Sequence, residues 1–327
     1  MPPGPTRRAA LGLPLVGLAL PGVAWAAADD YPNRPIHLAV GFAPGGGADI
    51  TGRVVGAKLS QMLGQQILVE NRTGASGIIA AEFVAKAPPD GYTLGVDTSA
   101  HAFNPSLYRK LPYDSEKDFT PISLVLRGPN VLLVHPDFPV HTVQDLIAMA
   151  KAKPGQLSYA SSGNGTAQTM SAELFKQMAG VDIVAIQYRG GAPALVDVSA
   201  GQVPLMFGYI SSSFPYIQDK RLRAVAVTSE KRWPTLPDVP TVAESGVPGY
   251  SVYEWNGIVG PAGLPAPILA RLHDAIVEAL NTDEVKDRLS ALGAELVGDT
   301  PEEYGAFIKA EIAKWSEVIK QAGIHSD

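Results

Sequence analysis

From about residue 30 onwards, short apolar runs alternate with longer segments whose apolar positions recur at helical spacing. Three of these runs predict strands, at residues 36–40, 66–70 and 92–97. The segments between them predict two helices, at residues 50–63 and 75–87. Strands that alternate with helices in this way indicate a parallel sheet covered by helices on both faces.

A second alternating series begins after residue 140. It predicts helices at 143–152, 167–179 and 194–200, and strands at 157–160, 183–187, 203–207 and 222–228. Two apolar runs precede this series, at 121–126 and 130–135. The residues Arg127-Gly128-Pro129 between them predict a break in the structure, where the chain crosses into a second domain.

The last part of the chain returns from this second series. It contains an apolar strand at 250–259, a helix at 268–280 and a final helix that begins with the capping box Thr300-Pro301-Glu302-Glu303. Because the two helices have no sheet of their own, we expect them to pack on the first domain. The predicted organisation is therefore two α/β domains, residues 27–127 with 250–327 and residues 128–249.

Three glycine-rich segments stand where a predicted strand meets a predicted helix, at 42–49, 161–166 and 188–193. The backbone N–H groups at a helix start, together with the helix dipole, attract an anion. None of the three has the Walker lysine or the G-x-G-x-x-G pattern of nucleotide-binding loops. Two polar segments, 98–105 and 209–214, are expected to be further loops at strand ends. Ligands of such sheets bind beyond the carboxyl ends of the strands, so these segments together predict a binding site for a small anion.

Composition excludes several classes of function. The 327 residues carry a formal net charge of −6 and no basic cluster, which argues against binding to nucleic acid. The absence of cysteine excludes a disulfide framework and a thiolate metal site. The six histidines are scattered and form no H-x-x-x-H pattern, so neither a metal nor a cofactor is expected.

The N-terminus has the features of an export signal. Arg7-Arg8 precede an apolar stretch at 9–23, and Ala24-Trp25-Ala26 has the small residues of a cleavage site. A membrane anchor is the alternative, but prolines at 14 and 21 interrupt a run shorter than the roughly 20 apolar residues that a span needs. We therefore expect a signal peptide at 1–26 and a mature chain in the periplasm without a membrane span.

Several sequence segments occur here together and in the order typical of one known family. They are 31–36, 40–46 with Asp49, 69–75, 88–93, 104–108, 118–122, 188–193 and 235–244. Through them the chain resembles, over almost all of its mature length, the Bug family of extracytoplasmic solute receptors of tripartite tricarboxylate transporters. The resemblance implies the α/β type II periplasmic binding-protein fold, with two hinged doubly wound domains and a ligand cleft between them. It also implies a monomer that is not an enzyme, binds a small organic carboxylate and delivers it to membrane transporter subunits.

The resemblance also implies which residues contact the ligand. In the first domain they are Phe42, Pro44, Gly45, Gly46 and Asp49 in the first glycine-rich segment, and Ser99, His101 and Asn104 after the third strand. In the second domain they are Ser162, Gly163, Gly165, Thr166, Tyr188, Arg189, Gly190, Gly191 and Asp197. Within this set we expect the helix start at 163–166, including the Thr166 hydroxyl, to hold a carboxylate, while Arg189 steers and flanks it.

Other interpretations of the same residues remain open. The glycines can serve tight turns alone, and Asp49 and Asp197 can be acids that a helix N-terminus favours. A hydrolase is a rival class, although the G-x-S-x-G nucleophile elbow is absent and Gly74-Ala75-Ser76-Gly77 does not complete it. A ligand-sensing subunit of a periplasmic signalling system would use the same fold as a transport receptor.

Overall fold

The computed structural model describes residues 30–291 and 293–324, together with Met1 and Gly4. The predicted signal peptide therefore lies, apart from those two residues, outside the described part of the chain. Residues Pro32–Asp327 form one compact unit, and the fold described below is that of this unit.

Ten strands form a mixed sheet within the described residues. They are β1 (Ile36–Val40), β2 (Ile67–Asn71), β3 (Thr93–Thr98), β4 (Phe119–Val134), β5 (Ser158–Ser161), β6 (Val184–Gln187), β7 (Leu205–Tyr209), β8 (Arg223–Val227), β9 (Tyr253–Pro261) and β10 (Glu295–Leu296). The order along the sheet is β2-β1-β3-β9-β4-β7-β5-β6, and β8 and β10 also pair with β4. β1 pairs in parallel with β2 and β3, and β5 pairs in parallel with β6 and β7, as the alternating pattern predicts.

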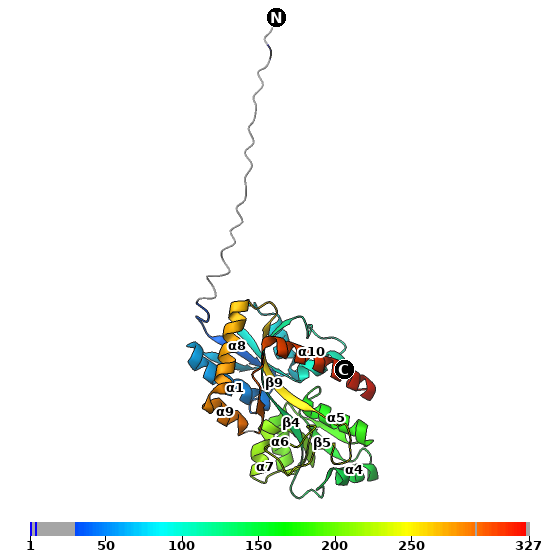
Figure 1. The fold of residues 1–327 in the computed structure, drawn as a ribbon. Helices are drawn as coiled ribbons and strands as arrows, with labels where there is room; N and C mark the ends of the chain where they lie inside the picture. Colours follow the sequence, from blue (N-terminus) through cyan, green and yellow to red (C-terminus); the bar gives the residue numbers. More distant parts are fainter. Residues whose placement is uncertain (2–3, 5–29, 292, 325–327) are drawn as a thin grey trace. The chain divides into compact units, whose positions relative to one another are not determined.

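The helices follow the strands in the same order along the chain. They are α1 (Gly47–Leu63), a 3-10 turn η1 (Ala75–Gly77), α2 (Ile78–Ala85), α3 (Ala100–Leu107), α4 (Val143–Ala152), α5 (Ala167–Ala179), α6 (Gly191–Ser199), α7 (Ile210–Gln218), α8 (Ala266–Asn281), α9 (Asp283–Ser290) and α10 (Pro301–Ala322). Helices α4 to α7 surround the β5–β7 end of the sheet, and α1, α8, α9 and α10 lie around the other end (Figure 1). A sheet flanked by helices is the α/β class that the sequence predicts.

Strand β4 connects the two ends of the sheet without the predicted break at residues 127–129. Its first part pairs with β9 up to Pro129, and its second part pairs with β7 and β8 from Asn130 and Val131 onwards. The prediction was wrong because Gly128 serves close packing rather than a turn. A Cβ at this position would lie only 2.7 Å from Ile210 Cγ2. The predicted domain boundary at 127/128 lies two residues before this change of pairing partners, and the division into two domains stays a prediction.

Two segments expected to be polar loops are helices instead. Residues 98–105 lead into α3, and residues 209–214 lead into α7, although each helix contains a proline, Pro105 or Pro215. In α3 the buried Phe103 ring meets Trp315 of α10 edge to face, with 4.7 Å between ring centroids. Tertiary packing of this kind overrides the weak local helix preference of such a sequence.

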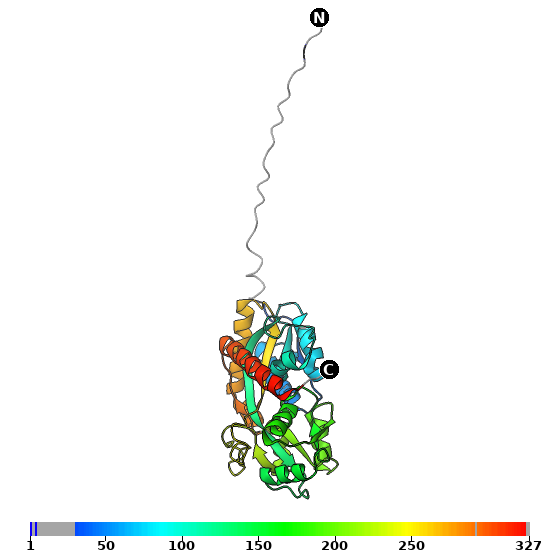
Figure 2. The same cartoon turned by 90° about the vertical axis from the view of Figure 1, so that its right-hand side faces the viewer.

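Three helices, rather than the predicted two, close the chain. The additional helix, α9, is short and polar, and only Val285 and Leu289 are buried on it, so its sequence carries little helical pattern. Helix α8 packs on α1, and α10 packs on α3 and lies across β4 (Figure 2). The expectation that the C-terminal helices return to the first elements of the fold is therefore confirmed.

Candidate functional site

Five helices begin at one pocket, which we call the cleft pocket. Its lining includes Gly46, Gly47 and Ala48 at the start of α1, Ser99 and Ala100 at α3, Thr166 and Gln168 at α5, Gly191 at α6, and Tyr209 and Ser212 at α7. Phe42, Thr98, Ser162 and Glu254 complete this pocket, which is partly open to solvent. Five sets of helix N-terminal N–H groups around one pocket make it suited to an anion.

The glycines let the two ends of the sheet meet closely at this pocket. A Cβ at Gly47 would lie 2.4 Å from Cδ1 of Tyr209, so only glycine fits between α1 and that ring. Gly190 has a φ of 120°, in the left-handed region that disfavours other residues, and a Cβ at this position would lie 3.4 Å from the Cβ of Ala43. The glycine-rich segments predicted from the sequence are thus brought together in space.

Several hydroxyl groups of the site are buried without a hydrogen-bond partner in the described structure. They belong to Ser99, Ser162, Tyr209 and Ser211, each of which is at most 4% exposed. Buried polar atoms are almost always satisfied in folded proteins, and the exceptions call for an explanation such as a bound molecule. The first three of these residues line the cleft pocket, so the pocket has free donors for a polar ligand.

Glu254 of β9 is a site residue that the sequence analysis missed. It is 6% exposed and lines the cleft pocket. Burial raises the pKa of its carboxyl, and the neighbouring Asp97 adds a smaller rise, while hydrogen bonds from Ser99 and the Ala167 N–H lower it; together they leave the pKa at about 8. The signal available in the sequence was one acidic residue within the apolar run 250–259.

Asp49 holds the first glycine-rich segment in place. It is 3% exposed, and its carboxylate accepts hydrogen bonds from the Gly45 N–H at 2.9 Å, from Asn71 at 2.8 Å and from Arg53. Burial raises its pKa, but these hydrogen bonds outweigh burial and leave the pKa below its ordinary value. Asp49 therefore shapes the loop that leads into α1, and it does not line the cleft pocket.

Thr166 has a different role from the one expected of it. It is the N-cap of α5: its Oγ1 accepts from the Thr169 N–H at 3.3 Å and donates to the Gly163 carbonyl at 3.0 Å. Its hydroxyl is thus already engaged, whereas the hydroxyl of nearby Ser162 has no partner. The expectation that Thr166 Oγ1 donates to a carboxylate stays a prediction, and the cap gives it no support.

A second, more open pocket adjoins the cleft pocket, and we call it the entrance pocket. Phe42 and Ser162 line both, and Gly163, Tyr188, Arg189 and Gly190 also line the entrance pocket, around about 970 Å³ of space partly open to solvent. Arg189 is exposed and forms no ion pair with any described residue. Tyr188 donates a hydrogen bond of 2.7 Å to Asp197, which positions the Tyr188 side chain at this entrance.

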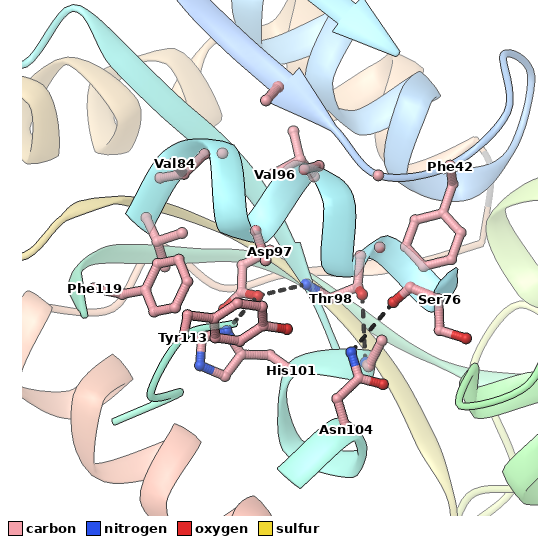
Figure 3. A pocket seen from close by; sticks show the side chains of 18 residues that line it. Phe42, Ser76, Val84, Val96, Asp97, Thr98, His101, Asn104, Tyr113 and Phe119 are labelled. Atoms are coloured by element: carbon pink, nitrogen blue, oxygen red, sulfur yellow. Dashed lines mark hydrogen bonds and ion pairs between the residues drawn. The ribbon is translucent and has the colours of Figure 1, made fainter. Parts of the chain in front are cut away.

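A third pocket, the inner pocket, is also lined by Phe42 and includes residues of β3, α2 and α3 (Figure 3). His101 and Asn104 line it together with apolar side chains. His101 Nδ1 lies 2.9 Å from Asp97, and Nε2 lies 2.6 Å from the Ser115 carbonyl. Both ring nitrogens are thus engaged within the protein, so a direct contact between His101 and a ligand stays a prediction without geometric support.

The predicted site residues divide among these pockets. Those in the cleft pocket are Phe42, Gly46, Ser99, Ser162, Thr166 and Gly191, and those in the entrance pocket are Phe42, Ser162, Gly163, Tyr188, Arg189 and Gly190. Five others, Pro44, Gly45, Asp49, Gly165 and Asp197, line none of the three pockets. Gly165 lies against Asn104, whose Oδ1 would be 2.9 Å from a Cβ at that position.

Neither a cluster of metal-binding side chains nor a membrane-spanning helix occurs in the described residues. The described residues contain no group of three or more histidine, aspartate or glutamate side chains arranged to hold a metal ion. Within the same ranges, no helix combines the length and the apolar character that crossing a bilayer requires.

An α/β fold in which several helix starts surround one pocket is typical of proteins that bind small solutes. Comparison with known proteins identifies the family. Residues 51–324 match the sequence profile described as tripartite tricarboxylate transporter family receptor. The chain belongs to this family.

Relatives and solved structures agree with this assignment. The protein BugT of Bordetella pertussis is 36% identical over 309 residues, which cover 94% of each chain. The structure of R. palustris Rpa4515 with adipate has a TM-score of 0.87 and 41% identity, over 90% of this chain and 99% of that one. MatC (Rpa3494) from Rhodopseudomonas palustris with bound malate has a TM-score of 0.85 and 34% identity, over 88% of this chain and all of that one. The predicted family and the periplasmic binding-protein fold are confirmed, and the chain is a solute-binding receptor.

Proposed function

We propose that this receptor captures a small dicarboxylate in the periplasm and delivers it to the membrane subunits of a tripartite tricarboxylate transporter, without chemical change of the ligand. The observation that carries the proposal is the cleft pocket, in which five helix starts surround three buried hydroxyls that lack partners. An ionised carboxylate can be buried only where donors replace its lost water, and this pocket supplies them. The adipate and malate of the two solved relatives belong to the same chemical class.

Each of the two ligand carboxylates occupies one of the two adjoining pockets. The first carboxylate lies in the cleft pocket at the helix starts, and Ser162 donates to it. The second reaches the entrance pocket, where the exposed Arg189 attracts it through solvent and therefore contributes little, because salt screens such a charge. Phe42, which lines both pockets, covers the chain of methylene groups between them.

A thermal-shift screen with malate, succinate, glutarate, adipate and pimelate tests this function. At a concentration a hundredfold above its dissociation constant, a true ligand stabilises the folded protein by about 2.7 kcal/mol. The uncharged diamide of adipate is the control and should give no shift, since it lacks the anionic groups. Absence of a shift with every dicarboxylate would contradict the proposal, and so would steady consumption of any of them by the purified protein.

A pair of variants at the start of α5 tests which hydroxyl holds the carboxylate. Ser162→Ala removes a hydrogen bond to a charged group and should weaken binding of the best ligand of the screen by about 1.5–3 kcal/mol, roughly ten- to a hundredfold. Thr166→Val removes the N-cap and should lower the free energy of unfolding by about 0.5–2 kcal/mol. Calorimetry and urea unfolding of both variants measure the two effects. If only Thr166→Val loses affinity, then Thr166, and not Ser162, holds the ligand carboxylate.

A further inference from the structure

Glu254 places an acidic side chain in the same pocket that we propose binds an anion. It lies on β9, paired with Gly128 of β4, where β4 changes from pairing with β9 to pairing with β7. Its side chain is buried and lines the cleft pocket beside the starts of α3 and α5. A carboxylate ligand in this pocket therefore lies close to a second carboxyl group.

No cation neutralises this acid. Among the described residues, no lysine, arginine or histidine forms an ion pair with Glu254. Arg127, next to its strand partner, pairs instead with the exposed Glu295 at 2.8 Å. The other ionisable groups that face Glu254 are Asp97 of β3 and Tyr209 at the end of β7. Asp97 has its own partners, His101 and Tyr304.

Two ionised carboxylates in one buried site repel each other strongly, and one of them then takes up a proton. A protonated carboxyl is a hydrogen-bond donor, and an O–H donor to a carboxylate makes a short, strong bond. Ser99 and the Ala167 N–H, at the starts of α3 and α5, lie beside the Glu254 carboxyl and lower its pKa, but burial outweighs them.

We propose that Glu254 binds the ligand in its protonated form and donates a hydrogen bond to the ligand carboxylate, so that solute capture depends on this carboxyl holding its proton. This inference rests on the proposed function. The same arrangement sets a preference among ligands. The pocket favours a carboxylate without an adjacent ammonium group, because a protonated Glu254 does not attract a cation. The pKa of the Glu254 carboxyl, raised to about 8, agrees with a group that is protonated at neutral pH before the ligand arrives.

The first test needs no ligand. An acid whose pKa is raised on folding stabilises the protein fully below its unfolded value of about 4.5 and loses that contribution as pH rises through its folded value of about 8. Between about pH 6 and pH 8 the unfolding constant of the wild type should therefore rise about tenfold per pH unit relative to Glu254→Gln. Glu230→Gln, which changes an exposed glutamate, is the matched control and should follow the wild type.

The second test uses the dicarboxylate that gives the largest shift in the screen above. Wild-type affinity should be constant near pH 6 and about tenfold weaker near pH 9, with an uptake approaching one proton per ligand near pH 9, measured by calorimetry in buffers of different ionisation enthalpy. Glu254→Gln retains an N–H donor of the same shape. It should bind within about threefold of the wild type near pH 6, without the pH dependence or the proton uptake.

The outcomes separate this inference from the proposed function. If no dicarboxylate binds the wild type, the function fails and the inference fails with it. If a dicarboxylate binds and Glu254→Gln shows the same pH dependence and proton uptake as the wild type, the inference alone is wrong. If Glu254→Gln loses most of its affinity at every pH, while aspartate or glutamate outcompetes adipate on the wild type, Glu254 is ionised and pairs with a ligand ammonium, which also overturns the inference.

Discussion

Asp97→Ala should lower the free energy of unfolding by about 3–5 kcal/mol, as expected when one member of a buried charged network is removed. Asp97 is 8% exposed, and its carboxylate accepts hydrogen bonds from His101 Nδ1 and from the Tyr304 hydroxyl, both at 2.9 Å. His101 and Tyr304 are themselves buried, so alanine leaves a ring N–H and a phenol O–H without partners.

Urea unfolding of the variant measures this effect, and the protein provides a matched control. Asp137 also lies beside a histidine, His135, but at 3.8 Å and with its side chain 94% exposed. Asp137→Ala should therefore change the free energy of unfolding by less than about 1 kcal/mol. Equal effects of the two substitutions would show that burial of the Asp97 network adds nothing to stability.

The same network predicts the direction of a pH effect. Burial lowers the pKa of His101, but Asp97 and the Ser115 carbonyl outweigh burial, so the pKa is raised. A histidine with a raised pKa contributes its stability fully below the unfolded value of about 6.5, and the contribution is lost as pH rises through the folded value. The stability difference between the wild type and His101→Gln should accordingly be larger near pH 6 than near pH 9.

The sequence predicted the elements of this fold where the apolar pattern is strong. Strands β1 and β6 and helix α5 agree with their predicted ranges within a few residues. The apolar pattern predicted the wrong local structure where packing between distant segments decides it. Residues 127–129 continue β4 because β9 pairs with them, and α3 is helical because Phe103 packs on Trp315.

The site could be predicted only in part for a related reason. Glycine-rich helix starts are visible in a sequence, and three of them surround the cleft pocket. Glu254 reaches that pocket because of how β9 pairs with β4, and a glutamate in a strand does not signal a ligand by itself. Hydrogen bonding within the protein is also invisible in the sequence, so Thr166 and Ser162 could not be told apart before the cap was seen.

Gly47→Val should abolish detectable capture of the best dicarboxylate, with an affinity loss of more than about a hundredfold, or about 2.7 kcal/mol. A Cβ at this position would lie 2.4 Å from Cδ1 and 2.8 Å from Cε1 of Tyr209, a ring that is only 2% exposed. Overpacking of a rigid site costs about 1–3 kcal/mol per inserted group, and here the added carbons also displace a wall of the pocket. The substitution therefore acts on the contact between α1 and β7 that brings the helix starts together.

Calorimetry of Gly47→Val and of the smaller Gly47→Ala measures this loss, with the melting temperature as a check that each variant is folded. Gly47→Ala should show a loss of about ten- to a hundredfold, because its single carbon makes the same close contact with Tyr209. Gly305→Val, in α10, is the control, since a Cβ there meets only Pro121 at 3.6 Å. Wild-type affinity in a folded Gly47→Val would mean that α1 and Tyr209 separate freely while the ligand is bound, and that the close approach of these two elements does not form the site.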